Sequence, residues 1–275
     1  MKDDELKKMF DNRNLNIIKS IIKTDIENII NILYLSIEYD IPEIIEYIFK
    51  KVSPDFCYNC DYTPLEYACL CGKIDSVKII INHKAAYIGK DNSLLYAASY
   101  GESEIYQILL KNSYDVNMSD NDGWNSCHWA AQENNVNIAK IALNYGCDIN
   151  ALNKKGFTPL YIASAENNID MVCFLLDNNA VPDLSEDVTP LIIACSYGNY
   201  QSAELLIRYG ADVNGTDSDN RTPLFYATLY GYPEIKEMLL SSGASGKIKD
   251  KYGIAPDDLN DTSILERLRI ELYGK

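Results

Sequence analysis

Short apolar blocks of one form recur along the chain, and polar segments separate them. Four copies begin with Thr-Pro-Leu: TPLEYAC (63–69), TPLYIAS (158–164), TPLIIAC (189–195) and TPLFYAT (222–228). Looser copies are NILYLSI (31–37), NSLLYAA (92–98) and NSCHWAA (125–131). Successive copies start 29 to 33 residues apart. Self-similarity at such a period indicates an array of stacked structural units.

Each block has the properties of a short helix. The threonine that opens the best copies can cap the helix through its hydroxyl. The proline that follows suits the first turn, where a helix needs no backbone N–H. Five positions after this threonine slot, a small residue recurs that lets neighbouring helices approach closely. These residues are Ala68, Ala97, Ala130, Ala163, Ala194 and Ala227.

Residues that tolerate a left-handed backbone recur where each first helix is expected to end. Nine positions after the threonine slot, they are Asp40, Gly72, Gly101, Asn134, Asn167, Gly198 and Gly231. A second apolar helix is predicted to follow. Twenty-one positions after the slot, Gly146, Asn179, Gly210 and Gly243 fit its end. Val52, Lys84 and Ser113 occupy that place in other copies and suit it less well.

This pattern resembles the ankyrin repeat, a β-turn finger followed by two antiparallel helices. The resemblance implies an all-α solenoid whose units contact only their neighbours. We expect N-terminal capping helices over residues 1–30, about seven repeats over 31–252 and a C-terminal capping unit over 253–275. The last block degrades to APDDLND at 255–261, where Asp257 replaces the core leucine, as suits an end of the array.

The amino-acid composition disfavours several classes of function. The chain of 275 residues is 47% hydrophobic and 24% charged, with a net charge of −15. This acidity disfavours binding to nucleic acid or to anionic membranes, which requires a basic surface. No apolar run is long enough to span a bilayer, and the charged start Met1–Glu5 predicts no signal peptide. Eight cysteines then indicate free thiols in a reducing compartment, the cytoplasm or alternatively the nucleus.

One group of cysteines has spacing that resembles a zinc site. Cys57 and Cys60 are spaced C-x2-C, and Cys69, Cys71 and His83 follow. In the repeat register, these residues fall on a finger, on a first helix and near the end of a second helix. Four ligands are not expected to converge from those places, and Cys69 takes the small core slot that Cys195 takes elsewhere. We therefore predict no metal site.

Other candidate chemistry has a structural interpretation. His128 takes the fourth place of its block, where ankyrin repeats commonly carry a hydrogen-bonding histidine, and no serine-acid grouping accompanies it. Asp217 to Asn220 is similar to the start of a calcium loop, but Thr222 and Thr228 stand where that loop needs Gly and Glu. Phosphate-binding glycine motifs are missing from the sequence. We predict no catalytic residues and no cofactor.

The resemblance also places residues on one concave face, formed by the fingers and the first helices. The residue before the threonine slot faces it: Tyr62, Asp91, Trp124, Phe157, Val188 and Arg221. So does the residue eight after the slot: Tyr39, Cys71, Tyr100, Glu133, Glu166, Tyr197 and Tyr230. Residues four after it are expected to be half-buried: Leu35, Tyr67, Tyr96, Trp129, Ile162, Ile193 and Tyr226.

Aromatic residues are therefore concentrated on or near this face. Tyr and Trp offer a large contact area with few torsions to order, and they dominate interface hot spots. Tyr67, Tyr96 and Trp129 are expected to pack between first helices. The predicted partner-binding residues are Tyr62, Tyr100, Trp124, Glu133, Phe157, Glu166, Tyr197 and Tyr230. Finger acids form an expected rim around them: Asp120, Asp122, Glu186 and Asp187.

These features favour a non-enzymatic scaffold that binds another protein. The expected partner carries an apolar anchor beside basic residues, and the scaffold is expected to be a monomer. A regulatory or effector adaptor that recruits cellular machinery is the alternative. An enzyme that depends on the cysteines or on zinc is the third and least favoured hypothesis.

Overall fold

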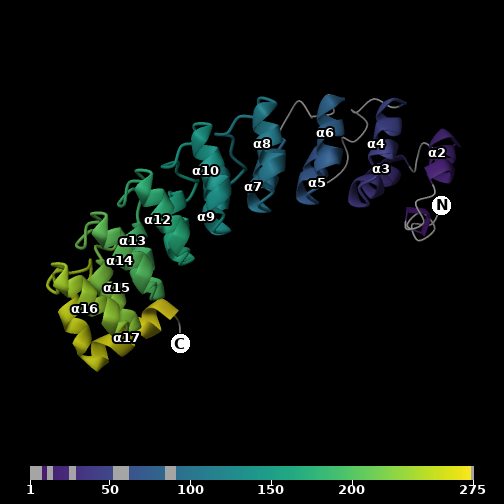
Figure 1. Ribbon diagram of the computed structural model, residues 1–275. Coiled ribbons are helices and arrows are strands. Elements are labelled where there is room, and N and C mark those ends of the chain that lie inside the picture. Colours follow the sequence, from purple (N-terminus) through teal and green to yellow (C-terminus); the bar gives the residue numbers. More distant parts are fainter. Residues whose placement is uncertain (1–7, 11–14, 25–28, 52–61, 84–90, 274–275) are drawn as a thin grey trace. The chain divides into compact units, whose positions relative to one another are not determined.

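The computed structural model describes residues 8–10, 15–24, 29–51, 62–83 and 91–273. The chain divides into two compact units, residues 1–118 and residues 119–275. Figure 1 labels the helices of both units. Within the described ranges, both units consist of helices and connecting turns without any strand. The predicted all-α class is confirmed.

The first unit contains seven labelled helices. In chain order they are α2 (Leu15–Thr24), α3 (Ile29–Glu38), α4 (Pro42–Phe49), α5 (Pro64–Leu70), α6 (Ile74–Asn82), α7 (Ser93–Ser99) and α8 (Ser103–Lys111). Helices α3 to α8 form consecutive pairs, in which first helices contact first helices and second helices contact second helices. Helix α2 contacts both members of the first pair, α3 and α4.

The second unit continues the same pattern. Its elements are α9 (Ser126–Gln132), α10 (Val136–Asn144), α11 (Pro159–Ala165), α12 (Ile169–Asp177), α13 (Pro190–Tyr197), α14 (Tyr200–Arg208), α15 (Pro223–Tyr230), α16 (Pro233–Ser241), the 3₁₀ helix η2 (Pro256–Asn260) and α17 (Thr262–Tyr273). The first helices α9, α11, α13 and α15 contact one another in order, and so do the second helices α10, α12, α14 and α16. This helix-pair solenoid is the predicted architecture.

The threonine slot caps the first helices as predicted. The Thr63 hydroxyl accepts a hydrogen bond from the Glu66 amide at 3.1 Å. Thr158, Thr189 and Thr222 make the same bond to the third helical residue. In α9, the Asn125 side chain takes this place and accepts from the His128 amide at 3.1 Å. Such caps satisfy an amide that the helix itself leaves without a partner.

The predicted helix ends adopt the left-handed backbone. All seven residues nine positions after the slot have positive φ, from 50° at Asp40 to 78° at Gly231. At the end of the second helices, Gly146, Asn179, Gly210 and Gly243 also have positive φ, and so does Ser113. Positions 52 and 84 lie outside the described residues. A short Gly or Asn at these positions therefore ends each helix at low conformational cost.

The interior of each unit is built from the recurring small and aliphatic residues. The six alanines of the predicted slot are completely buried, as are Cys69 and Cys195. Side-chain amides add contacts between repeats: Asn168 Nδ2 donates to the carbonyl oxygen of Ala131 at 2.8 Å. Asn199 Nδ2 donates to the carbonyl oxygen of Ser164 at 2.9 Å in the next repeat. The register of neighbouring repeats is thus held by both packing and polar contacts.

The C-terminal elements cover the last helix pair. Ile254, Leu259 and Leu268 form one buried cluster with Phe225 and Leu229 of α15. Leu259 of η2 thereby provides the apolar contact that Asp257 cannot provide. Phe225 and Leu229 of α15 are thus buried against residues that follow position 253.

Candidate partner-binding surface

An Asp or Asn side chain shapes several of the fingers that precede the first helices. Asp120 Oδ1 accepts hydrogen bonds from the amides of Asp122 and Trp124, each at 2.9 Å. Asn153 Oδ1 does the same for the amides of Lys155 and Phe157, at 2.9 Å and 3.0 Å. These bonds fix the backbone of the residue that precedes the threonine slot, so Trp124 and Phe157 are presented from an ordered turn.

Trp124 is half-buried beside two aromatic neighbours of α9. Its ring centroid lies 4.9 Å from that of Trp129 and 5.8 Å from that of His128. One part of the indole therefore packs against the helix and the rest remains accessible. Trp129 is half-buried as predicted, whereas Ile162 and Ile193, in the same slot of the next two repeats, are buried.

Phe157 has a comparable position one repeat later. Its ring stacks on Tyr161 of α11, with centroids 4.0 Å apart and an interplanar angle of 8°. Burial raises the pKa of Tyr161 to about 12, so this tyrosine is neutral at physiological pH. The stacked pair limits the motion of Phe157 while leaving it half-buried.

The predicted slot at the end of the first helices is open to solvent. Glu133 and Glu166 are exposed, and Tyr197 exposes 62% of its surface. Tyr230 is half-buried and packs against Tyr226, with centroids 5.9 Å apart. We call the surface formed by Trp124, Glu133, Phe157, Glu166, Tyr197 and Tyr230 the first-helix face of the second unit.

Tyr62 and Tyr100 belong to the first unit. Tyr62 is half-buried, with its ring 5.6 Å from that of Tyr96, and its carbonyl oxygen accepts a hydrogen bond from the Tyr34 hydroxyl. Tyr100 exposes 59% of its surface at the end of α7. Tyr67 packs edge-on against Tyr34 at 5.1 Å, in agreement with its predicted role between first helices.

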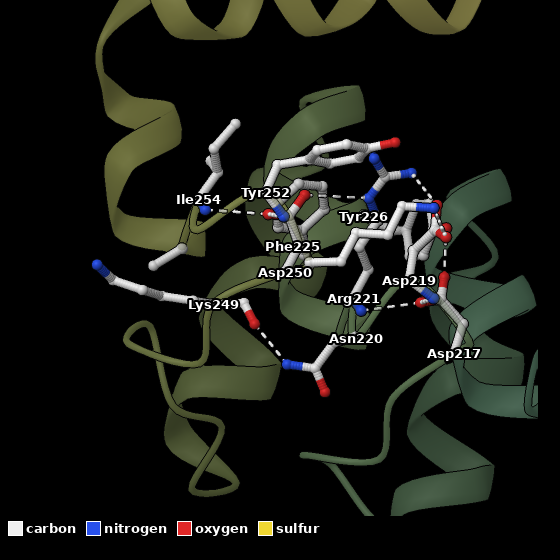
Figure 2. Close-up of polar contacts among 12 residues, drawn as sticks. Asp217, Asp219, Asn220, Arg221, Phe225, Tyr226, Lys249, Asp250, Tyr252 and Ile254 are labelled. Carbon is white, nitrogen blue, oxygen red and sulfur yellow. Dashed lines mark hydrogen bonds and ion pairs between the residues drawn. The ribbon is translucent and has the colours of Figure 1, made fainter.

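Two residues expected on the concave face are instead buried. Arg221 is 5% exposed, and its guanidinium lies between Asp219 and Asp250 at 3.2 Å and 3.4 Å (Figure 2). Asp91 is 7% exposed and accepts a hydrogen bond from the Tyr114 hydroxyl at 2.6 Å. At these two positions the slot before the threonine therefore provides no surface, because its charged side chain is engaged by the protein's own polar groups.

The segment that is similar to a calcium loop, Asp217 to Asn220, forms part of the finger that contains Arg221. Asp217 Oδ1 accepts from the amides of Asp219 and Arg221, while Oδ2 accepts from the Tyr226 hydroxyl at 2.6 Å (Figure 2). Burial and the Asp217 carboxylate raise the pKa of the Tyr226 hydroxyl. The carboxylate oxygens of Asp217 are thus occupied by the protein's own donors, in agreement with the structural interpretation of this segment.

His128 also has the predicted hydrogen-bonding role. The ring is fully buried, and its Nε2 lies 2.9 Å from the carbonyl oxygen of Phe157. Glu66 occupies the same place in its own repeat, where its Oε1 accepts from the Asn92 amide at 2.9 Å. Both side chains reach from a first helix to the start of the next repeat.

The cysteines do not form a cluster in the described residues. Cys57 and Cys60 lie outside those residues, and no group of three or more potential metal ligands occurs within them. Cys127 and Cys147 are buried, with their Sγ atoms 3.1 Å apart. Burial raises the pKa of the Cys69 and Cys195 thiols well above the usual value.

Sequence reasoning missed the finger-shaping residues as a set. Asp120, Asn153, Asp217 and Asp250 all stand five positions before the threonine slot and make the same pair of backbone bonds. Their recurrence at a fixed offset was visible in the sequence. The sequence-based expectations placed Asp120 only in the acidic rim and Asp217 only at the start of a calcium-like segment. In the structure, Asp122, Glu186 and Asp187 are all exposed, and Asp187 accepts a hydrogen bond from the Ser218 amide.

The helix pairs, capped turns and stacked first helices define a helical repeat solenoid. A family model described as ankyrin repeats, three copies, matches residues 94–186 and 179–250. The matched residues make up more than half of the chain, which therefore belongs to the ankyrin-repeat family. Ankyrin repeats generally mediate protein–protein interactions and are typically non-enzymatic. A search of curated proteins found no match.

None of the helices in the described part is long and apolar enough to cross a bilayer.

Proposed function

We propose that this protein binds a partner protein through the first-helix face of its second unit. The partner segment would carry an apolar anchor with lysine or arginine beside it. The observation that carries the proposal is the placement of Trp124 and Phe157, held by finger bonds and half-buried one repeat apart. Rigid aromatic groups of this kind bind with little loss of conformational entropy.

The charges around the aromatics support the choice of partner. Glu133 and Glu166 are exposed at the same helical position of α9 and α11. Tyr197 and Tyr230 follow in that position on α13 and α15, and together they extend an aromatic and acidic surface. Such a surface complements a segment that is both apolar and basic. In the first unit, Tyr62 and Tyr100 are proposed to contribute contacts of the same kind.

Affinity capture from the source cell tests this function. The wild-type chain should retain a partner that Trp124→Ala loses, since truncation of a hot-spot aromatic costs roughly 2 kcal/mol or more. Tyr145→Ala is the matched control, because Tyr145 is 45% exposed at the end of a second helix. Circular dichroism checks that both variants remain folded. Normal capture by folded Trp124→Ala would exclude this face as the binding site.

A further inference from the structure

A cleft of about 830 Å³ lies between α14 and α16 in the second unit. These two second helices are in contact, and Figure 1 shows them as neighbours. The lining residues are Gly198, Tyr200, Glu204, Tyr232, Glu234, Ile235, Glu237, Met238 and Ser241. Ligand pockets in proteins typically have volumes of roughly 300–1,000 Å³.

The helical periodicity places these residues on two facing surfaces. On α16, Glu234, Glu237, Met238 and Ser241 follow the spacing i, i+3, i+4, i+7 and so lie along one side. On α14, Tyr200 and Glu204 are four residues apart and share a side as well. The cleft is thus bounded by ordered helices rather than by loops.

One end of the cleft depends on a glycine. Gly198 has a φ of 76°, and a Cβ atom at this position would lie 2.6 Å from the ring of Tyr232. The ring therefore rests against the glycine backbone, while Ile235, 2% exposed, packs beneath the surface. Tyr200 exposes 39% of its surface at the opposite helix. The walls accordingly combine aromatic, thioether and aliphatic groups.

The cleft carries negative charge without a basic residue among its lining groups. Glu204, Glu234 and Glu237 are exposed, and no ion pair joins them to any described residue. The basic residues of the two helices are engaged elsewhere. Lys236 Nζ donates to Asn260 at 3.1 Å, and the Arg208 guanidinium lies 5.6 Å from the centroid of the Tyr209 ring.

From this arrangement we infer that the cleft between α14 and α16 binds an arginine-containing segment of a partner protein. A guanidinium can stack on the Tyr200 or Tyr232 ring and donate paired hydrogen bonds to a carboxylate. The aliphatic stem of the arginine would pack against Met238. Lysine fits less well because its ammonium is a compact charge without a planar face.

This site is separate from the first-helix face. Its residues belong to second helices and to the turns that precede them, whereas Trp124, Phe157 and the glutamates of the first-helix face belong to fingers and first helices. Binding at this cleft does not require binding at the first-helix face. A partner could engage either surface alone or use both.

Fluorescence anisotropy with a defined probe tests the cleft. The probe is a short fluorescein-labelled peptide that alternates arginine with glycine and serine, titrated with the full chain. The test variant is Glu204→Gln/Glu237→Gln. The matched control, Asp170→Asn/Glu266→Gln, removes two exposed carboxylates outside the cleft and so has the same net charge.

The test variant should bind the probe about tenfold more weakly than the wild type, and the control should bind almost as well as the wild type. Replacement of arginine by lysine in the peptide should also weaken binding. Thermal unfolding confirms that both variants are folded. An equal loss of affinity in the test and control variants would mean that only the net charge matters, and would contradict the site. Failure of the wild-type chain to bind the probe would also contradict it. Loss with Trp124→Ala but not with the test variant would instead place the peptide on the first-helix face.

Discussion

His128 Nε2 lies 2.9 Å from the carbonyl oxygen of Phe157, which links α9 to the start of the next repeat. On the other side of the ring, Nδ1 accepts the Asn125 amide at 3.2 Å. Nδ1 also lies 2.7 Å from Asn125 Oδ1, so the ring contacts both the amide and the side chain of the residue that caps α9. The histidine therefore connects the cap of one helix with the residue that the first-helix face presents one repeat later.

Removal of this ring should destabilise the protein. His128→Ala loses two hydrogen bonds and leaves the buried Asn125 amide without its acceptor, which costs about 1–3 kcal/mol in addition to the lost packing. Equilibrium urea unfolding measures the change. Lys140→Ala, at an exposed position of α10, is the control and should change stability little. A His128→Ala chain as stable as this control would show that the bridge contributes nothing.

The same residue should make stability depend on pH. Burial lowers the pKa of His128 below its ordinary value of 6.5. The unfolded chain therefore binds a proton that the native chain does not, as pH falls through about 6.5 and towards the lowered native pKa. The free energy of unfolding should decrease in that window and show no contribution from His128 above it. His128→Gln should flatten this part of the profile in urea unfolding. Identical profiles for both proteins would contradict the prediction.

Thiol reactivity should follow burial. The Cys147 contact and burial together raise the pKa of Cys127, and burial raises that of Cys69 and Cys195. Since the thiolate is the reactive form, these three should react with iodoacetamide more slowly than the half-buried Cys71 and Cys173. Mass spectrometry of timed samples gives the order. In denaturant, all eight cysteines should titrate. Stoichiometric zinc in the purified chain would contradict the structural role of the cysteines.

Deletion of residues 253–275 should expose the end of the array. Phe225 and Leu229 would lose Ile254, Leu259 and Leu268 as packing partners. We expect aggregation or a lower unfolding midpoint, measured by light scattering and thermal scans. Leu259→Ala is the milder test and should cost about 2–5 kcal/mol, as for other buried leucines. A truncated chain with the solubility and midpoint of the full chain would make this segment a tail rather than a cap.

Partner binding should depend on salt through the acidic residues. Glu166→Lys reverses an exposed charge on the first-helix face. It should slow association with a basic partner mainly at low ionic strength. At higher salt the Debye length is shorter, so exposed charges on the two proteins are screened from one another. Surface plasmon resonance at two salt concentrations measures both rates. Asp170→Lys, on a second helix, is the control. An equal effect of both variants would mean that only the net charge matters.

The repeat pattern was sufficient to predict the architecture. Helix caps, helix ends and close helix contacts each require a particular kind of residue. Thr63 and its counterparts supply the caps, the residues with positive φ from Asp40 to Gly231 supply the ends, and the recurring alanines allow the close contacts. These requirements recur once in every repeat, so the positions of the residues that meet them could be predicted from the sequence. The hydrogen-bonding role of His128 was expected from the resemblance to ankyrin repeats, whereas its contact with the Phe157 carbonyl oxygen reaches the next repeat and is set by the tertiary structure.

Only the tertiary structure determined which side chains at one position of the repeat are exposed to solvent. Trp124, Asp91 and Arg221 share one slot, yet only Trp124 has substantial exposed surface, because Tyr114 engages Asp91 and two finger carboxylates engage Arg221. The cleft between α14 and α16 likewise depends on the approach of Tyr232 to Gly198 from another helix. Exposure and cleft formation arise from contacts of particular side chains, many of them between neighbouring repeats. A periodic pattern specifies the slots but not which side chains meet there.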